Sequence, residues 1–413
     1  MNGRQAEKYL LALELFGMRF GLDRMHRLMT VLGMPQRRFA SIHVVGSNGK
    51  SSTVRMIAAI LERHSVRTGS YTSPHLRSFG ERVEVGERPL SDAELGAAVG
   101  AAAHAATLVD RTAADDGDRV TQFEALTAAA YHELARRGVD VAVIEAGLGG
   151  RFDATNVIPS KVQVLTGISL EHTRLLGSTP AAIAEEKLAV VPDHGCLVAP
   201  ERLDPQIERV LARVAVERNA RLLRASEPVG PALRARGEFQ RRNFALARAT
   251  AAAFLGVLDE HAVARAAAEV ELPGRLQVVA GEPPLILDGA HNPDGAHALA
   301  ESVAGAARGR RLTGLFAVLD DKDAEAMLSV LLPLCERAVY TAVDSSRSLP
   351  PAALAAVGER LDGPPAEIVG DARAALERAR ALAGTEGAVL ATGSLHLVGE
   401  LLREAGDVRA SRL

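Results

Sequence analysis

The chain has 413 residues, of which 47% are hydrophobic and 24% charged, with a formal net charge of −3. One hydrophobic core rarely serves a chain of this length, so we expect two domains. A basic excess and stacking aromatic side chains are typical of nucleic-acid-binding surfaces. This sequence has neither, with 3% aromatic residues and no Trp, so no nucleic-acid partner is expected.

The two cysteines, Cys196 and Cys335, stand far apart and outside any CxxC pattern. This usage fits a reducing compartment and predicts neither a disulfide framework nor a zinc site. The apolar stretch at residues 9–16 is interrupted by Glu14 and is too short for a signal peptide. The sequence contains no run of about 18 apolar residues, the length that could span a bilayer. We therefore expect a cytoplasmic protein without a membrane partner.

In the first half of the chain, predicted helices and short apolar strands alternate. Two helices are expected first, at 5–16 and 23–32. The predicted strands are 41–45, 67–71, 139–144 and 162–168, and the predicted helices between and after them are 50–64, 122–137 and 181–191. Such alternation predicts an α/β fold with a doubly wound parallel sheet, whose ligands bind at the carboxyl ends of the strands.

Two stretches interrupt this alternation. Residues 101–119 turn Ala-rich and then Asp-rich, which indicates an exposed loop near 113–118. Residues 271–284 carry several Pro and Gly residues, and a fresh series of strands follows at 285–288, 312–318, 338–342 and 388–391. We place a domain boundary near residue 279, with domains at 1–279 and 280–413.

A glycine-rich loop lies between the first strand and its helix. It is composed of Gly46, Ser47, Asn48, Gly49, Lys50, Ser51, Ser52 and Thr53. Glycines let backbone N–H groups turn toward phosphate oxygens, and the helix N-terminus adds the positive end of its dipole. Lys50 supplies a mobile charge for the outer phosphates, and a following hydroxyl can face Mg²⁺. An ordinary βα turn is the alternative, but the strand before and the helix after favour a nucleotide site.

The loop is shorter than the usual GxxxxGK[ST] pattern, and it resembles the loop of the Mur ligase superfamily. Further motifs follow in order. They are 43–50 (HVVGSNGK), 71–76 (YTSPHL), 121–124 (TQFE), 145–156 (EAGLGGRFDATN), 169–173 (SLEHT), 273–275 (PGR), 288–293 (DGAHNP) and 321–323 (DKD). Together they resemble the folate branch of that superfamily, folylpolyglutamate synthase and dihydrofolate synthase, over nearly the whole chain. Ser47, Ser51 and Glu171 depart from this family's usual Thr, Gly and Asp.

The resemblance implies a P-loop-type, ATP-binding N-terminal domain and a smaller Rossmann-like C-terminal ligase domain. It also implies an activity: ATP-dependent addition of L-glutamate to dihydropteroate or to a (tetrahydro)folate polyglutamate, through an acyl phosphate. ATP serves as co-substrate. Many bacterial relatives use both acceptors, so we expect this chain to use both. We also expect a monomer.

Four residues are implied as Mg²⁺ ligands, with two ions expected: Ser73, Glu145, His172 and Lys187. Glu145 closes an apolar strand and offers the hard oxygen atoms that Mg²⁺ prefers. Imidazole suits transition metals better, so His172 has an alternative role in organising its loop, and Ser73 has one as a helix cap before Pro74. Lys187 is expected to be carbamylated, although a solvated helix residue is the alternative. It is one of only five lysines among 48 basic residues.

The resemblance also supplies the remaining site residues. Lys50, Lys187 and His291 are the predicted catalytic residues. Asn243, Arg275 and Asp288 join the phosphate loop as predicted ATP contacts. The predicted substrate contacts are Gln122, Phe123, Glu124, Arg151, Phe152 and Asp153. The segment 20–24 is a further candidate for the pterin-bearing substrate.

Two other functions compete with this interpretation. A ligase that adds an amino acid to a cell-wall nucleotide precursor is the nearer one, but the strings at 71–76 and 145–156 argue against it. A non-catalytic nucleotide-binding switch would lack the metal carboxylate, Lys50 or Lys187. All three are present, so we expect an enzyme.

Overall fold

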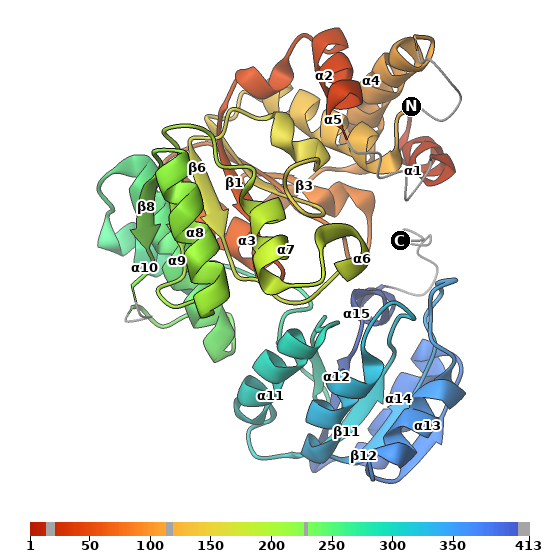
Figure 1. The fold of residues 1–413 in the computed structure, drawn as a ribbon. Helices are drawn as coiled ribbons and strands as arrows, with labels where there is room; N and C mark the ends of the chain where they lie inside the picture. The colour runs from red at the N-terminus through yellow and green to blue at the C-terminus, as the bar shows by residue number, and fades with distance from the viewer. Residues whose placement is uncertain (14–20, 113–118, 227–229, 404–413) are drawn as a thin grey trace. The chain divides into compact units, whose positions relative to one another are not determined.

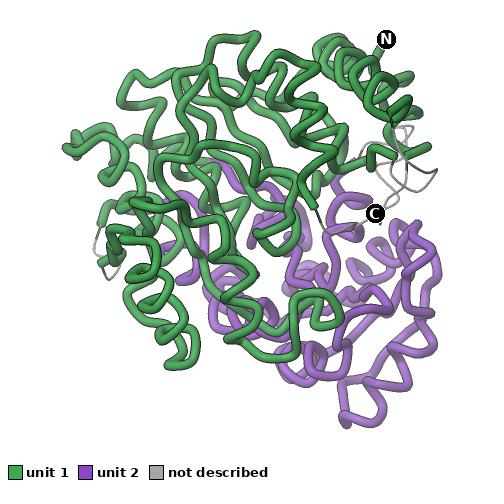
Figure 2. Tube along the Cα trace, turned by 45° about the horizontal axis from the view of Figure 1, so that its top comes forward, with its two compact units in different colours: residues 1–232, 242–270 green, residues 233–241, 271–413 purple. Residues whose placement is uncertain are grey.

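The computed structural model describes residues 1–13, 21–112, 119–226 and 230–403. The loop predicted at 113–118 and the end of the first predicted helix lie outside these residues. The described chain forms two compact units, one of residues 1–232 and 242–270 and one of residues 233–241 and 271–413 (Figure 2). The boundary predicted near residue 279 falls at the end of a strand that pairs within the second unit.

The first unit is built on an eight-stranded sheet with the order β4-β3-β2-β5-β1-β6-β7-β8 (Figure 1). Six strands run parallel, whereas β3 and β4 join one edge as antiparallel strands. The strands are β1 (Ala40–Val45), β2 (Thr68–Tyr71), β3 (Val83–Val85), β4 (Arg88–Pro89), β5 (Val141–Glu145), β6 (Val162–Leu165), β7 (Cys196–Ala199) and β8 (Arg221–Arg224). The predicted α/β class is therefore confirmed for this unit.

The helices of the first unit pack on its sheet or on one another. They are α1 (Gly3–Ala12), α2 (Asp23–Val31), α3 (Lys50–Arg63), α4 (Asp92–Asp110), α5 (Gln122–Arg136), α6 (Thr173–Leu176), α7 (Pro180–Leu188), α8 (Pro205–Glu217) and α10 (Glu260–Glu269), with short 3₁₀ turns η1 (Pro35–Arg37), η2 (Phe79–Arg82) and η3 (Ala154–Val157). Helix α9 (Glu238–Leu255) runs from the second unit into the first. One core joins α1, α2, α4 and α5 to β2 and β5, and another joins α7 and α8 to β1, β6 and β7.

Local sequence signals explain where several helices begin. The Thr121 side chain accepts a hydrogen bond from the N–H group of Glu124, whose carboxylate accepts one from the N–H group of Thr121, so a capping box starts α5. Ser91 and Glu94 do the same for α4. Because these caps satisfy N–H groups that the helix itself leaves unpaired, they fix the first turn of each helix.

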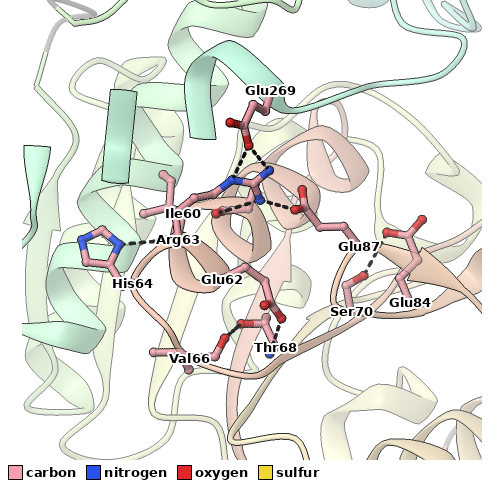
Figure 3. A network of polar contacts seen from close by, with 11 residues as sticks. Ile60, Glu62, Arg63, His64, Val66, Thr68, Ser70, Glu84, Glu87 and Glu269 are labelled. Atoms are coloured by element: carbon pink, nitrogen blue, oxygen red, sulfur yellow. Dashed lines mark hydrogen bonds and ion pairs between the residues drawn. The ribbon is translucent and has the colours of Figure 1, made fainter. Parts of the chain in front are cut away.

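The far end of α3 is tied to α10 by a network of charged groups (Figure 3). The Arg63 guanidinium donates to Glu269 from Nε (3.1 Å) and Nη2 (2.8 Å), and it also pairs with Glu87. His64 Nε2 accepts from the N–H group of Asp259 at 2.9 Å. Helix α3 is thus held at its C-terminal end, the end away from the glycine-rich loop.

The second unit has its own six-stranded sheet, with the order β13-β12-β11-β14-β10-β9, in which only β9 is antiparallel. The strands are β9 (Gln277–Val279), β10 (Leu285–Leu287), β11 (Arg311–Phe316), β12 (Cys335–Tyr340), β13 (Ala366–Ile368) and β14 (Gly387–Thr392). The helical elements are α11 (Pro293–Ala307), α12 (Ala324–Leu331), η4 (Leu332–Leu334), α13 (Pro351–Arg360), α14 (Ala372–Ala383) and α15 (Leu395–Leu402). In neither unit does a described helix have the length and apolarity needed to cross a membrane.

Candidate active site

The phosphate loop joins β1 to α3, as its sequence predicts, and its two glycines are sterically required. Gly46 has φ +146°, and a Cβ there would lie 2.0 Å from Thr166 Oγ1. Gly49 is the left-handed N-cap of α3, and a Cβ there would lie 2.6 Å from Asn243 Oδ1. The structure therefore brings Asn243, a predicted ATP contact, against the loop.

Polar side chains from the end of β6 brace this loop. The Thr166 hydroxyl donates to the Asn48 carbonyl oxygen at 2.7 Å, and Ser47 Oγ accepts from the N–H group of Ser169 at 3.0 Å. Lys50 Nζ donates to the Ser47 carbonyl oxygen at 3.0 Å, and so curls back over the loop. The loop shape is thus held by groups other than a bound nucleotide.

Lys187 lies beneath the phosphate loop and is not a solvated helix residue, because only 2% of its surface is exposed. Its Nζ donates to the Gly46 carbonyl oxygen at 2.8 Å and to Glu171 Oε1 at 3.1 Å. Burial and the neighbouring Lys50 lower the pKa of Lys187 to about 8, although Glu171 opposes them. About a tenth of the amine is then neutral at pH 7, far more than for an ordinary lysine.

Glu171 stands between the two lysines. Burial alone would raise the pKa of its carboxyl group, but Lys50, Lys187 and Ser47 outweigh burial and lower that pKa to about 2. The next residue, His172, is exposed and adopts a left-handed conformation (φ +48°) as it begins the short helix α6. Two lysine amines and one carboxylate therefore gather at the loop.

Glu145 closes β5, which lies beside β1 in the sheet, so its carboxylate reaches the same edge as the phosphate loop. It is buried, and its Oε2 accepts from the N–H group of Ser73 at 3.1 Å. Ser73 caps no described helix, since the next element is η2, whose N-cap is Ser78. A buried carboxylate beside a serine fits a hard cation, which prefers oxygen ligands. Within the described residues no three His, Cys, Asp or Glu side chains cluster as a metal site.

The six predicted substrate residues differ in what their side chains do. Gln122 donates to the Leu10 carbonyl oxygen, and Glu124 pairs with Arg24, so both side chains are engaged inside the fold. The Asp153 carboxylate is also buried and accepts hydrogen bonds from its own loop. By contrast, Phe123 and Phe152 are half-buried and Arg151 is exposed, where it pairs with Glu186. Phe20, in the other candidate segment, lies outside the described residues.

The predicted residues of the second unit gather around the end of β10. Asp288 accepts from the N–H groups of Leu276 (2.7 Å) and Ala290 (2.8 Å), and burial raises its pKa while Arg275 opposes that rise. His291 Nδ1 lies 2.9 Å from the Gly289 carbonyl oxygen. Asp288, Arg275 and His291 thus form one local group at the carboxyl end of a parallel strand, where ligands bind in such sheets.

Three residues near the phosphate loop had no role predicted from the sequence. Thr166, Ser169 and Glu171 contact the phosphate loop or Lys187. A usable signal existed: all three follow β6, and β6 pairs with β1. The carboxyl ends of neighbouring parallel strands lie at one sheet edge, so hydroxyls just after β6 must lie near the loop after β1.

A phosphate loop with a buried lysine beneath it, in an α/β fold followed by a second parallel-rich sheet, defines a Mur-type ligase. The family model described as "Mur ligase, glutamate ligase domain" matches residues 274–395. The chain is 38% identical over 380 residues to the Mycobacterium tuberculosis dihydrofolate synthase/folylpolyglutamate synthase, a match that covers 82% of this chain and 78% of that protein. The chain belongs to the dihydrofolate synthase/folylpolyglutamate synthase family.

Other comparisons agree with this assignment. A probable bifunctional folylpolyglutamate synthase/dihydropteroate synthase of Haloferax volcanii is 36% identical over 97% of this chain, which spans 50% of that longer protein. The M. tuberculosis folylpolyglutamate synthase complexed with ADP superposes with a TM-score of 0.90 at 34% identity, over 97% of each chain. A bifunctional folylpolyglutamate synthase/dihydrofolate synthase solved with Mn, AMPPNP and L-glutamate has a TM-score of 0.83 at 28% identity, again over 97% of each chain. The predicted family, fold class and ligase class are confirmed.

Proposed function

We propose that this chain uses ATP to join L-glutamate, through an amide bond, to a carboxylate of dihydropteroate and of (tetrahydro)folate polyglutamates. The observation that carries the proposal is the placement of two lysines on the phosphate loop, where Lys50 and Lys187 donate to its carbonyl oxygen atoms. Glu145 joins them in the proposal, because it ends the strand that pairs with the one before the loop. Family membership supports the choice of folate-type acceptors and glutamate.

A carboxylate is a poor electrophile, so the amide bond needs activation. A carboxylate oxygen of the acceptor attacks the γ-phosphorus of ATP, the bond to the bridging oxygen breaks, and ADP leaves. The amine of glutamate then attacks the acyl phosphate carbon, inorganic phosphate departs, and the amine gives up a proton. Both steps depend on positioning and charge neutralisation more than on covalent chemistry by the protein.

Each residue has a role in this scheme. The N–H groups of the loop and the start of α3 bind the phosphates, and Lys50 neutralises charge on the transferred phosphoryl group. Asn243 lies against Gly49 and contacts the nucleotide. In the second unit, Arg275, Asp288 and His291 take part in ATP binding and catalysis. Phe123, Phe152 and Arg151 are the accessible members of the predicted acceptor site.

Two Mg²⁺ ions complete the proposal, and the donor set fits them in part. Glu145 and Ser73 offer hard oxygen atoms, whereas His172 is an unusual ligand for this ion. When bound, the metal would shield the phosphate charge during transfer. A carbamate on Lys187 would add a second buried carboxylate. The neutral amine attacks CO₂, a C–N bond forms, and one proton is released. The low pKa and burial of Lys187 support this modification. A cytoplasmic, monomeric enzyme remains our prediction.

The proposal is tested by ADP release from the purified chain with Mg²⁺, ATP and glutamate, offered dihydropteroate or tetrahydrofolate. We expect stimulation by both acceptors and loss of it in Lys50→Met. The control Lys161→Met changes an exposed lysine and keeps the rate. Stimulation by one acceptor would narrow the assignment to one activity. Stimulation by a cell-wall precursor alone would refute the folate acceptor while leaving the ligase chemistry.

A further inference from the structure

A buried histidine, which the proposed chemistry does not use, begins a chain of hydrogen bonds to the acceptor loop. His43 lies in β1 and is fully buried, and its Nε2 is 2.8 Å from Thr155 Oγ1. Thr155 in turn bonds to Asp153 Oδ1 through its hydroxyl. No hydrogen-bond partner for His43 Nδ1 exists among the described residues, although that atom is buried.

The direction of these bonds follows from counting protons. Asp153 accepts the N–H groups of Leu148 (2.8 Å, on Oδ2) and Thr155 (3.0 Å, on Oδ1), and a further one from Gly147. A carboxyl group surrounded by donors favours its ionised, acceptor-only form. The single hydroxyl proton of Thr155 is therefore given to Asp153, and the Thr155 oxygen must accept from His43 Nε2–H.

Burial agrees with this direction, since it lowers the pKa of His43 to about 3. A charged imidazole would place a second N–H group, on Nδ1, where no partner receives it, and such a buried donor is costly. Burial also raises the pKa of Asp153, but the Thr155 hydroxyl and the three N–H groups oppose that rise. The chain therefore has one consistent set of donors: neutral His43, then Thr155, then the Asp153 carboxylate.

This chain of bonds holds the loop between β5 and η3. Asp153 binds the N–H groups at one end of the loop, and Tyr131 fixes the other end by donating to the Thr155 carbonyl oxygen at 2.9 Å. The loop packs closely on the predicted acceptor site, since a Cβ on Gly147 would lie 2.5 Å from the Phe123 ring. The loop also carries Arg151 and Phe152, so its shape decides where they lie.

We propose that His43 and Thr155 are positioning residues for the folate-type acceptor: the donor chain His43–Thr155–Asp153 holds the 147–153 loop in the shape that binds it. The inference deepens the proposed function and rests on it for the identity of the acceptor. Neither residue touches substrate; both act through Asp153 and the loop. This role could not be predicted from the sequence, because His43 and Thr155 are 112 residues apart.

Matched substitutions at Thr155 test the proposal. Thr155→Val keeps the shape and removes the hydroxyl, whereas Thr155→Ser keeps the hydroxyl. We expect Thr155→Val to raise KM for the acceptor about tenfold, the equivalent of one hydrogen bond of about 1.4 kcal/mol, with KM for ATP unchanged, and Thr155→Ser to stay near wild type. Thr250→Val is the control, since it removes an equally buried hydroxyl that donates to the Leu246 carbonyl oxygen, one turn back in its own helix. An equal rise in KM for the acceptor and for ATP would overturn the proposal. So would an equal rise in KM for the acceptor in Thr155→Val and Thr155→Ser.

Two readouts do not depend on turnover, so they separate this inference from the proposed function. In ¹⁵N-histidine spectra, His43, assigned by its absence in His43→Gln, should be the neutral Nε2–H tautomer. In hydrogen exchange, Thr155→Val should expose the Leu148 amide at least about tenfold faster, with Thr250→Val unchanged. An Nδ1–H tautomer of His43 would refute the donor chain even if the enzyme is active. So would an exchange rate of the Leu148 amide that is the same in Thr155→Val as in wild type. An inactive protein with both signatures would refute only the acceptor assignment.

Discussion

Lys187 Nζ lies 2.8 Å from the carbonyl oxygen of Gly46, so helix α7 is hydrogen-bonded to the first residue of the phosphate loop. The same amine donates to Glu171, and Lys50 lowers its pKa from nearby. A lysine needed only for its charge would be replaceable by arginine. A lysine needed for a neutral amine would not, because arginine stays protonated.

This difference gives the first prediction. We expect Lys187→Met and Lys187→Arg each to lower kcat at least about 100-fold, as the loss of a transition-state electrostatic partner does. We also expect wild-type activity to fall in CO₂-free buffer and to return with added bicarbonate, measured by ADP release. Lys161→Met, an exposed lysine, is the control and should respond to bicarbonate as wild type does. An active Lys187→Arg enzyme, or activity indifferent to bicarbonate, would rule out the carbamate.

A second prediction compares two glycines of positive φ, Gly49 and Gly138. Both have positive φ, +81° and +62°, so alanine at either position adds backbone strain of about 1 kcal/mol. Only Gly49 has a close neighbour: a methyl group there would lie 2.6 Å from Asn243 Oδ1, whereas one at Gly138 would have nothing within 4 Å. We expect Gly49→Ala to raise KM for ATP at least about tenfold, and Gly138→Ala to lower stability without changing KM. Similar ATP kinetics for the two variants would contradict the contact with Asn243.

The elements that carry the phosphate loop could be predicted from sequence because their signals are local. The helix predicted at 50–64 is observed at Lys50–Arg63, and the strand predicted at 41–45 is observed at Ala40–Val45. Glycine spacing and an apolar run are enough for such a βα unit. The short strands β3 and β4, the last two at one side of the sheet, escaped prediction, because two or three residues, one of them Pro89, carry too little pattern.

Whether a given polar side chain binds substrate or bonds within the fold was harder to predict than the helices and strands. Gln122, Glu124 and Asp153 carry the polar groups expected in a substrate site, yet each side chain is bonded within the fold. Whether a polar group faces solvent depends on partners far away in sequence, such as Arg24, which lies 100 residues from Glu124. Sequence pattern contains no information on that pairing, so structural and substrate-binding roles look alike there.

The third prediction tests the structural role of Glu124. Arg24 Nε lies 3.0 Å and 3.1 Å from the two carboxylate oxygens of Glu124, and both side chains are buried. Removing one partner leaves an uncompensated buried charge, so Arg24→Met should lower the free energy of unfolding by about 3 kcal/mol. Glu124→Gln added to Arg24→Met should recover part of the loss, measured by denaturant titration of the four proteins of the cycle. Additive losses would show that the pair contributes nothing as a pair.

The fourth prediction concerns pH, through the buried imidazole of His43. Its pKa is about 3 in the folded chain, against an ordinary value of 6.5, so below pH 6.5 the unfolded chain binds a proton that the folded chain does not. The contribution of neutral His43 to the free energy of unfolding is therefore fully present above pH 6.5 and is lost as the pH falls toward 3. Between pH 7 and pH 5 the loss should be about 2 kcal/mol.

Chemical denaturation at pH 7, 6 and 5 measures this loss as a difference between proteins, because all other titrating groups are shared. Wild type should lose about 2 kcal/mol more than His43→Gln across this range. His104→Gln, an exposed histidine on α4, should follow wild type. Parallel pH profiles for wild type and His43→Gln would mean that the folded chain accepts a proton at His43, and the donor chain to Thr155 would then need a different arrangement of protons.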